Sequence, residues 1–213
     1  MFLSRIELCT KKPSTRRAIA SPQVLHAVIE GSIPTIPGTE KERKLWRIDS
    51  LNQRLYLLLL TPSRPNFTEL VKQFCQPGTT GESKDYTAHL SDIHVGQHFR
   101  FRLRGNPVHS VFVEKGKRGK VYAHVTVAQK RGWLIKKAAS CGFALKDDDF
   151  DLVETGHHKF HREVKKPLVE LAYSVFEGLL TVTDAELFTH ALTQGIGRGK
   201  AYGCGLLTVM RVR

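Results

Sequence analysis

Apolar side chains in this chain follow the same order of spacing patterns twice. In the first half the patterns predict a strand, a helix, two paired strands, a helix and a last strand, at residues 2–9, 22–30, 45–49, 54–61, 66–74 and 86–90. In the second half they predict a strand, a helix, a strand pair, a helix and a last strand, at residues 99–104, 126–140, 168–182, 184–193 and 206–212. Alternating apolar residues indicate a half-buried strand, and apolar residues three and four apart indicate a helix.

This order is that of the ferredoxin-like fold, strand–helix–strand–strand–helix–strand. A chain of 213 residues has room for one large domain or two small ones. We therefore expect an α+β protein of two tandem βαββαβ domains, residues 1–92 and 93–213. The second copy carries insertions, among them a return strand at 111–114. We expect residues 11–17 to form a basic loop, and the strand pair at 168–182 to turn at Glu177 and Gly178.

The chain is strongly basic, and the charge is uneven. Its formal net charge is +13. Residues 1–92 hold 13 Lys and Arg against 9 Asp and Glu, whereas residues 93–213 hold 20 against 11. Such a charge favours a polyanionic partner, either nucleic acid or a membrane surface. No helix pattern joins a broad apolar face to a lysine-rich one, which argues against the membrane.

Cysteine usage and hydropathy indicate the compartment. The four cysteines, Cys9, Cys75, Cys141 and Cys204, are scattered and include no C-x-x-C pair. That pattern suits a reducing cytosol and argues against a disulfide framework or a zinc site. The longest apolar run, Leu55 to Leu60, is too short to cross a membrane, and no signal-peptide segment precedes the first strand. We therefore expect a cytoplasmic protein.

A segment near the end of the chain, residues 194–207, contains five glycines together with Arg198 and Lys200. Glycine-rich backbone exposes N–H groups, and with two cations it forms a surface suited to phosphate. The spacing fits neither the dinucleotide fingerprint nor the P-loop, because Lys200 and Tyr202 occupy positions where the fingerprint requires glycine, and Ala201 follows the lysine. A tight turn with a helix C-cap remains the alternative.

Basic residues gather in three further places. Arg100, Arg102 and Arg104 alternate with apolar residues, so they share one strand face at intervals of about 6.8 Å. A phosphate-binding face and a merely solvated face both fit this pattern. Two clusters of basic residues, the first interspersed with glycine and the second flanked by histidine, are typical of basic hairpins that approach a phosphate backbone. Their cations are Lys115, Lys117, Arg118 and Lys120 in the first, and Lys159, Arg162, Lys165 and Lys166 in the second.

Three other sites hold groups that can carry chemistry. His26 lies on the first expected helix, where it is either a residue of the helix–sheet boundary or a proton carrier. Asp147, Asp148, Asp149 and Asp151 are close in sequence, and we interpret them as a solvated turn in preference to a metal site. The histidines at 157, 158 and 161 stand among cations, a setting that favours RNA over a dication.

Several of these segments together resemble the CasE family, the CRISPR-associated endoribonuclease of the type I-E Cascade complex. The resemblance rests on the M-F-L-S-R-I start, the His26 helix, F-R-L-R-G-N-P at 101–107, Trp133-Leu134, F-E-G at 176–178 and G-I-G-R-G-K-A-Y-G-C-G-L-L at 195–207. It covers the chain from end to end. It implies tandem RRM-like domains and cleavage of CRISPR repeat RNA at the 3′ base of its stem-loop, without metal or cofactor. The 2′-hydroxyl upstream of the break attacks, which leaves 2′,3′-cyclic phosphate and 5′-hydroxyl ends, and the enzyme retains the product as a Cascade subunit.

The resemblance also assigns residues. His26 matches the catalytic histidine, as proton donor or acceptor. Lys120 is the candidate that stabilises charge on phosphorus, with Lys117 or Arg118 as alternatives. Gln23 stands where some relatives have a tyrosine, so it can orient groups by hydrogen bonding. The other cations are assigned to RNA binding: Arg102, Arg104, Lys115, Lys159, Arg162, Lys165, Lys166, Arg198 and Lys200.

Two alternatives to a metal-independent ribonuclease stay open. One is a non-catalytic RNA-binding subunit of the same fold, in which His26 is incidental. The other is a metal-dependent nuclease that uses Asp147 to Asp151, and it predicts that EDTA abolishes activity. The expected partners are the CRISPR repeat stem-loop and the other Cascade subunits.

Overall fold

The computed structural model describes residues 1–34, 43–111, 119–161 and 167–212. Six of the cations assigned to RNA lie outside these residues, and nothing follows for them from the structure. They are Lys115, Lys117, Arg118, Arg162, Lys165 and Lys166. Residues 112–114 of the expected return strand also lie outside.

The first half of the chain forms a four-stranded antiparallel sheet in the order β2-β3-β1-β4. Its strands are β1 (Phe2–Leu8), β2 (Leu45–Leu51), β3 (Arg54–Thr61) and β4 (Glu82–Asp85). Three helices accompany them, α1 (Pro13–Ala20), α2 (Pro22–Gly31) and α3 (Thr68–Phe74). Leu25 and Ile29 of α2 pack with Ile6 and Leu57 of the sheet in one buried cluster. This is the connectivity and strand order of a ferredoxin-like unit.

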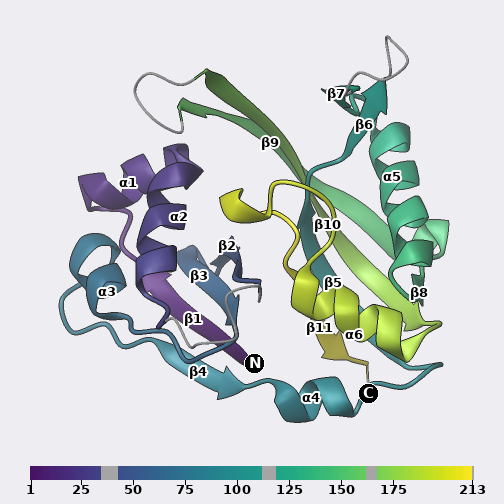
Figure 1. Ribbon diagram of the computed structural model, residues 1–213, viewed down its shortest axis with the longest axis horizontal. Helices are drawn as coiled ribbons and strands as arrows, with labels where there is room; N and C mark the ends of the chain where they lie inside the picture. Colours follow the sequence, from purple (N-terminus) through teal and green to yellow (C-terminus); the bar gives the residue numbers. More distant parts are fainter. Residues whose placement is uncertain (35–42, 112–118, 162–166, 213) are drawn as a thin grey trace.

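The second half repeats that connectivity with longer strands. Its sheet has the order β11-β5-β10, with β9 on the far side of β10 and the short β8 (Phe143–Ala144) pairing at the end of β10. The elements are β5 (His98–Gly105), α5 (Val127–Ser140), β9 (Phe150–His161), β10 (Leu168–Val182), α6 (Ala185–Gln194) and β11 (Leu207–Arg211). The expected tandem ferredoxin-like fold is confirmed, and Figure 1 shows the two sheets side by side.

Two expectations for the first half are wrong. Residues 11–17 are not a loop, because α1 begins at Pro13, and Thr15 donates a 2.9 Å hydrogen bond to the carbonyl of Phe74. The last strand is β4, not residues 86–90, where the helix α4 (Thr87–Ser91) stands instead. The sequence E-S-K-D of β4 has no apolar residue and therefore no alternation to read. It becomes a strand because its backbone pairs with β1.

One expectation for the second half is also wrong. Residues 168–182 form one strand, and Gly178 is no turn, because it lets the backbone of Asp149 and of Phe150, at the start of the neighbouring β9, approach closely. Of the expected return strand at 111–114 only Val111 is described, and it belongs to β6 (Val108–Val111), which pairs with β7 (Lys120–Ala123) in a separate hairpin. At the start of α5 the side chain of Val127 is exposed, whereas Trp133 and Leu134 further along the helix are buried.

A buried arginine connects the two sheets. Arg47 of β2 is 1% exposed and pairs with Asp49 at 2.7 Å. It also donates 2.8 Å hydrogen bonds to the carbonyls of Arg102 and Leu206 and to Oγ1 of Thr208. Because those acceptors belong to the second half, one side chain of the first half satisfies three polar groups of the other.

Candidate active site

His26 lies on α2, at the side of the helix that faces the second half of the chain. Proline at the first position of α2 sets its start directly after Ser21. Leu25 and Ile29 turn into the core, and this leaves the imidazole of His26 at the boundary, 28% exposed. Such partial exposure keeps the ring within reach of a ligand.

Two groups lie against the imidazole of His26. Nδ1 is 3.8 Å from Oε1 of Glu30, one helical turn further along, and Oε2 of the same carboxylate binds Nζ of Lys44 at 2.7 Å. From the second half, the ring of Tyr202 meets the imidazole edge-on, with centroids 6.1 Å apart and planes at 76°. The site therefore combines a titratable histidine, a carboxylate, an ammonium group and a phenol from two halves of the chain.

The glycine-rich segment is the element that carries Tyr202 to α2. It leaves α6 at Gly195, with φ of 74°, and forms a 3-10 turn (Lys200–Tyr202) between Gly199 and Gly203, which are both left-handed. Nε1 of Trp46 donates a 3.3 Å hydrogen bond to the carbonyl of Ala201. Figure 1 shows this segment, in yellow, reaching between α2 and β10. The backbone forms the tight turn and helix cap that the sequence left as an alternative, and phosphate binding by the segment stays a prediction.

The two cations of the glycine-rich segment differ in environment. Arg198 is exposed. Lys200 is half-buried, and burial, with a smaller contribution from Arg43, lowers the pKa of its ammonium group. Both remain candidates for phosphate contact, and Arg198 is the more accessible.

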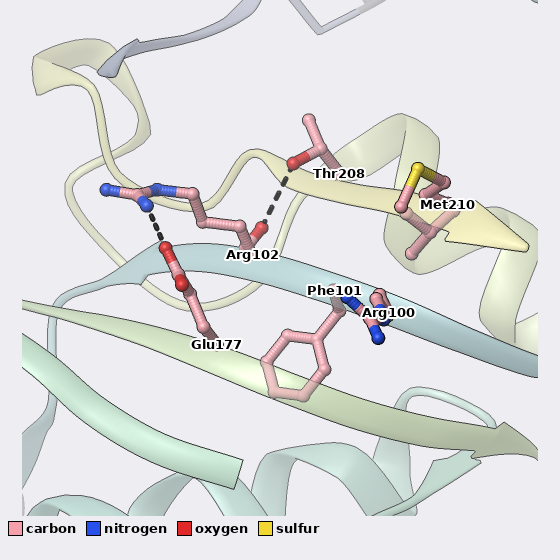
Figure 2. A pocket seen from close by; sticks show the side chains of 7 residues that line it. Arg100, Phe101, Arg102, Glu177, Thr208 and Met210 are labelled. Carbon is pink, nitrogen blue, oxygen red and sulfur yellow. Dashed lines mark hydrogen bonds and ion pairs between the residues drawn. The ribbon is translucent and has the colours of Figure 1, made fainter. Parts of the chain in front are cut away.

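The arginines of β5 have protein partners. Arg102 pairs with Glu177 and, at 3.2 Å, with Asp49 of the first half, and Figure 2 shows its guanidinium turned to Glu177 while its carbonyl meets Thr208. Arg104 is 9% exposed, lies 3.6 Å over the ring of Tyr173 and contacts Nε2 of His158 at 2.7 Å. Their assignment to RNA phosphates therefore stays a prediction, and the structure gives both of them structural partners.

His158 joins the second half to the backbone just before α2. Its ring stacks on Tyr173 with centroids 5.2 Å apart, and it hydrogen-bonds the backbone of Ala20, next to the start of α2. Burial and, to a smaller extent, Arg104 lower the pKa of His158. A neutral imidazole accepts from Arg104 and donates to a carbonyl at the same time.

The remaining candidates lie on three separate elements. Lys120 is exposed on β7, and Figure 1 places the β6–β7 hairpin on the other side of β10 from α2. The structure thus does not bring Lys120 to His26. Lys159 is exposed on β9 and pairs with Glu170 at 2.7 Å. Gln23 is half-buried on α2, one turn before His26, and therefore lies on the same helix face.

Metal and membrane features can be assessed for most of the chain. Within residues 1–34, 43–111, 119–161 and 167–212, no three His, Cys, Asp or Glu side chains come together as ligands for a metal ion. Asp147, Asp148 and Asp149 form a 3-10 turn. In the same described residues, no helix is long and apolar enough to span a membrane.

The sequence did not single out Glu30, Lys44 or Tyr202. Glu30 carried a readable signal, since residues four apart on a helix are neighbours. Lys44 and Tyr202 carried none, because Lys44 meets Glu30 and Tyr202 meets His26 only through the packing of other segments.

The fold and the site define a tandem ferredoxin-like protein with an accessible histidine where its two halves meet. The chain matches the family model described as "CRISPR associated protein" over residues 1–211, and it belongs to that family. It is 29% identical over 220 residues to the CRISPR-associated endoribonuclease Cse3 of Thermus thermophilus, with 98% of this chain and 99% of the relative covered. It is 31% identical over 125 residues to the Cascade subunit CasE of Escherichia coli, covering 55% of this chain and 60% of that one.

Solved structures agree with these matches. Thermus thermophilus Cse3 bound to an RNA that represents a pre-cleavage complex has a TM-score of 0.80 and 27% identity, with 98% of each chain covered. Cas6e of Escherichia coli has a TM-score of 0.61 and shares the fold. The resemblance to CasE expected from the sequence is confirmed.

Proposed function

We propose that this protein is an endoribonuclease that cleaves CRISPR repeat RNA at the 3′ base of its stem-loop and retains the mature RNA as a subunit of Cascade. The observation that carries the proposal is the end-to-end match to Cse3, together with the placement of His26 at an exposed junction of the two halves. An incidental histidine of a binding subunit would need neither that exposure nor contacts from both halves.

The chemistry needs no group beyond RNA and protein. The 2′-hydroxyl upstream of the break loses its proton and attacks phosphorus, while the 5′-oxygen of the next nucleotide leaves and takes up a proton. The products are a 2′,3′-cyclic phosphate and a 5′-hydroxyl, so no water is consumed in this step. His26 moves one of the two protons, at either the attacking or the departing oxygen.

Charge that develops on phosphorus has to meet cations or amide groups held in place. Lys120 is the residue that the resemblance assigns to this role, and the position of β7 means that RNA would have to bring the hairpin and the scissile phosphate together. Lys44 is a second candidate, because its ion pair with Glu30 holds an ammonium group beside the His26 helix.

The test is single-turnover cleavage of a labelled cognate repeat in EDTA. We expect wild type to cut, and His26→Ala to cut about 10²- to 10⁴-fold more slowly with unchanged affinity, the range typical for loss of a general acid or base. A substrate with 2′-deoxy at the nucleotide upstream of the break should bind and remain intact. His190→Ala, an exposed histidine on α6, is the matched control and should cut at the wild-type rate.

Three outcomes would change the proposal. A wild type that binds the repeat and never cuts it is an RNA-binding subunit. Cleavage that EDTA abolishes points to a metal-dependent nuclease. Normal cleavage by His26→Ala assigns the proton transfer to another residue.

A further inference from the structure

The side chain of His26 is held only weakly by the described residues of its own half. Glu30, the carboxylate beside it on α2, is 3.8 Å from Nδ1 and 43% exposed. That distance is too long for a hydrogen bond, and a solvated ion pair restrains little. A partly exposed imidazole on a helix surface exchanges rotamers rapidly unless something else packs against it.

The ring of Tyr202 supplies that second contact. It meets the imidazole edge-on with centroids 6.1 Å apart, a geometry that is favourable for aromatic pairs and restricts the ring plane. Because Nδ1 faces Glu30, Nε2 lies on the opposite side of the imidazole ring. A fixed ring plane therefore restricts the directions in which the nitrogen that faces away from Glu30 can point.

Tyr202 is itself held rigidly. Its ring packs edge-on against Phe160 of β9 at 4.8 Å, and Phe160 is 4% exposed. Its amide donates a 2.9 Å hydrogen bond to the carbonyl of Gly199. On the other side Gly203, with φ of 79°, lies so near Trp46 that a Cβ atom there would come within 2.7 Å of the indole. Side chains locked by their own packing are what a precise site requires.

We propose that Tyr202 is a positioning residue for His26, and that its aromatic ring, rather than its hydroxyl, orients the imidazole for proton transfer. This inference rests on the proposed function, since His26 is the proton carrier in it. The inference assigns the glycine-rich segment a role besides phosphate binding. The left-handed glycines on both sides of the 3-10 turn shape the backbone so that Tyr202 packs against α2.

The first measurement needs no RNA. In the wild-type protein, NMR should show cross-relaxation between the ring protons of Tyr202 and those of His26. The same His26 ring protons should change chemical shift in Tyr202→Leu and keep it in Tyr202→Phe. Absence of the cross-relaxation, or an unchanged His26 signal in Tyr202→Leu, overturns the inference even if the protein cuts no RNA.

The second measurement is single-turnover cleavage beside RNA affinity. Tyr202→Leu should cut about 10- to 100-fold more slowly, as expected when a catalytic group is slightly misplaced, with affinity within about 2-fold of wild type. Tyr202→Phe should cut within about 3-fold of wild type, and Tyr56→Leu, a tyrosine of β3 remote from the site, should cut normally. A Tyr202→Phe variant as slow as Tyr202→Leu assigns the effect to the hydroxyl, and a normal Tyr202→Leu removes Tyr202 from the mechanism; either result overturns the inference.

Discussion

The two halves of the chain have the same topology, but they differ in the length of their strands and in the segments inserted between the shared elements. In the first half the strands have four to eight residues, the helices cover one face, and the sheet ends at the short β4. In the second half β9 and β10 have 12 and 15 residues, a separate hairpin is inserted after β5, and the glycine-rich segment follows α6. Figure 1 shows the long β9–β10 hairpin reaching beyond its sheet.

The two halves contribute different residues to the candidate site. The first half supplies the helix with His26, and the second half supplies Tyr202, His158 and most of the basic charge. Neither half holds the complete site, so the function depends on how firmly the halves are joined. The following experiments act on that junction or on one half at a time.

The largest effect is expected at Arg47, the buried arginine between the sheets. Arg47→Met leaves the carboxylate of Asp49 without its closest partner and removes a buried donor from two carbonyls of the second half. Breaking a buried ion pair from one side costs roughly 3–5 kcal/mol of the free energy of unfolding. Urea denaturation should therefore show a much lower midpoint.

Arg54→Met is the matched control for Arg47. Arg54 stands on the adjacent strand β3 and pairs with Glu7 at 3.3 Å, but it is 65% exposed. Its loss should change the free energy of unfolding by no more than about 1 kcal/mol. Equal midpoints for the two variants would mean that Arg47 does not join the halves.

Gly203→Ala tests the contact between the glycine-rich segment and the first half. The new Cβ atom would face the indole of Trp46 at 2.7 Å, in a backbone conformation that L residues rarely adopt. We expect a loss of roughly 1–3 kcal/mol and slower cleavage, because the neighbouring Tyr202 is displaced. Thermal melting and single-turnover rates measure both effects.

Gly132→Ala provides the comparison for this substitution. Gly132 lies inside α5 with open space around it, so alanine should stabilise the protein by up to about 1 kcal/mol. A Gly203→Ala protein as stable and active as wild type would contradict the docking of the segment on Trp46.

A smaller, pH-dependent effect is expected at His158. Its pKa in the folded protein is lowered by burial and by Arg104, so the unfolded chain binds more protons than the folded one just below the ordinary histidine pKa of 6.5. Stability from this group is complete above pH 6.5 and is lost as the pH falls below it. The melting temperature of wild type should therefore drop between about pH 6.5 and pH 5.

His158→Gln removes the titration and keeps a side chain that can donate and accept. Its melting temperature should fall less steeply than that of wild type over the same pH range. His89 and His124, whose pKa values burial also lowers, leave a residual slope in the variant. Identical slopes would show that His158 is not buried against α2 in solution.

The smallest effect concerns the charge of the β9–β10 hairpin. If Lys159 contacts an RNA phosphate, Lys159→Gln should weaken binding and reduce the slope of log affinity against log salt by roughly 0.7–0.9. Lys72→Gln, an exposed lysine on α3 of the first half, should leave the slope unchanged. If the RNA affinity of the wild type does not vary with salt concentration, the basic residues do not bind RNA phosphates.

Local pattern was sufficient for most elements. The helices expected at 22–30, 126–140 and 184–193 appear as α2, α5 and α6, within one residue at each end. Pattern failed for β4, which has no apolar residue, and for Gly178, where a glycine that permits close strand packing looked like a turn. In both cases the deciding contact is with another strand, and no local signal reports it.

Candidate residues divide in the same way. The placement of His26 on a helix and of the glycines between α6 and β11 was readable from spacing. The alternation at Arg100, Arg102 and Arg104 correctly predicted one strand face, but not that Arg102 would meet Asp49 and Glu177 or that Arg104 would stack on Tyr173.

The sequence by itself determined the tandem order of elements, the basic charge of the second half and the family. Those properties follow from periodicity, composition and short motifs, which are local. Only the tertiary structure decided which groups surround His26 and Glu30, because Tyr202 reaches the imidazole and Lys44 reaches the carboxylate from other segments of the chain. Two copies of one topology can be read from a chain one after the other, but their relative placement depends on contacts such as those of Arg47, which join residues far apart in sequence.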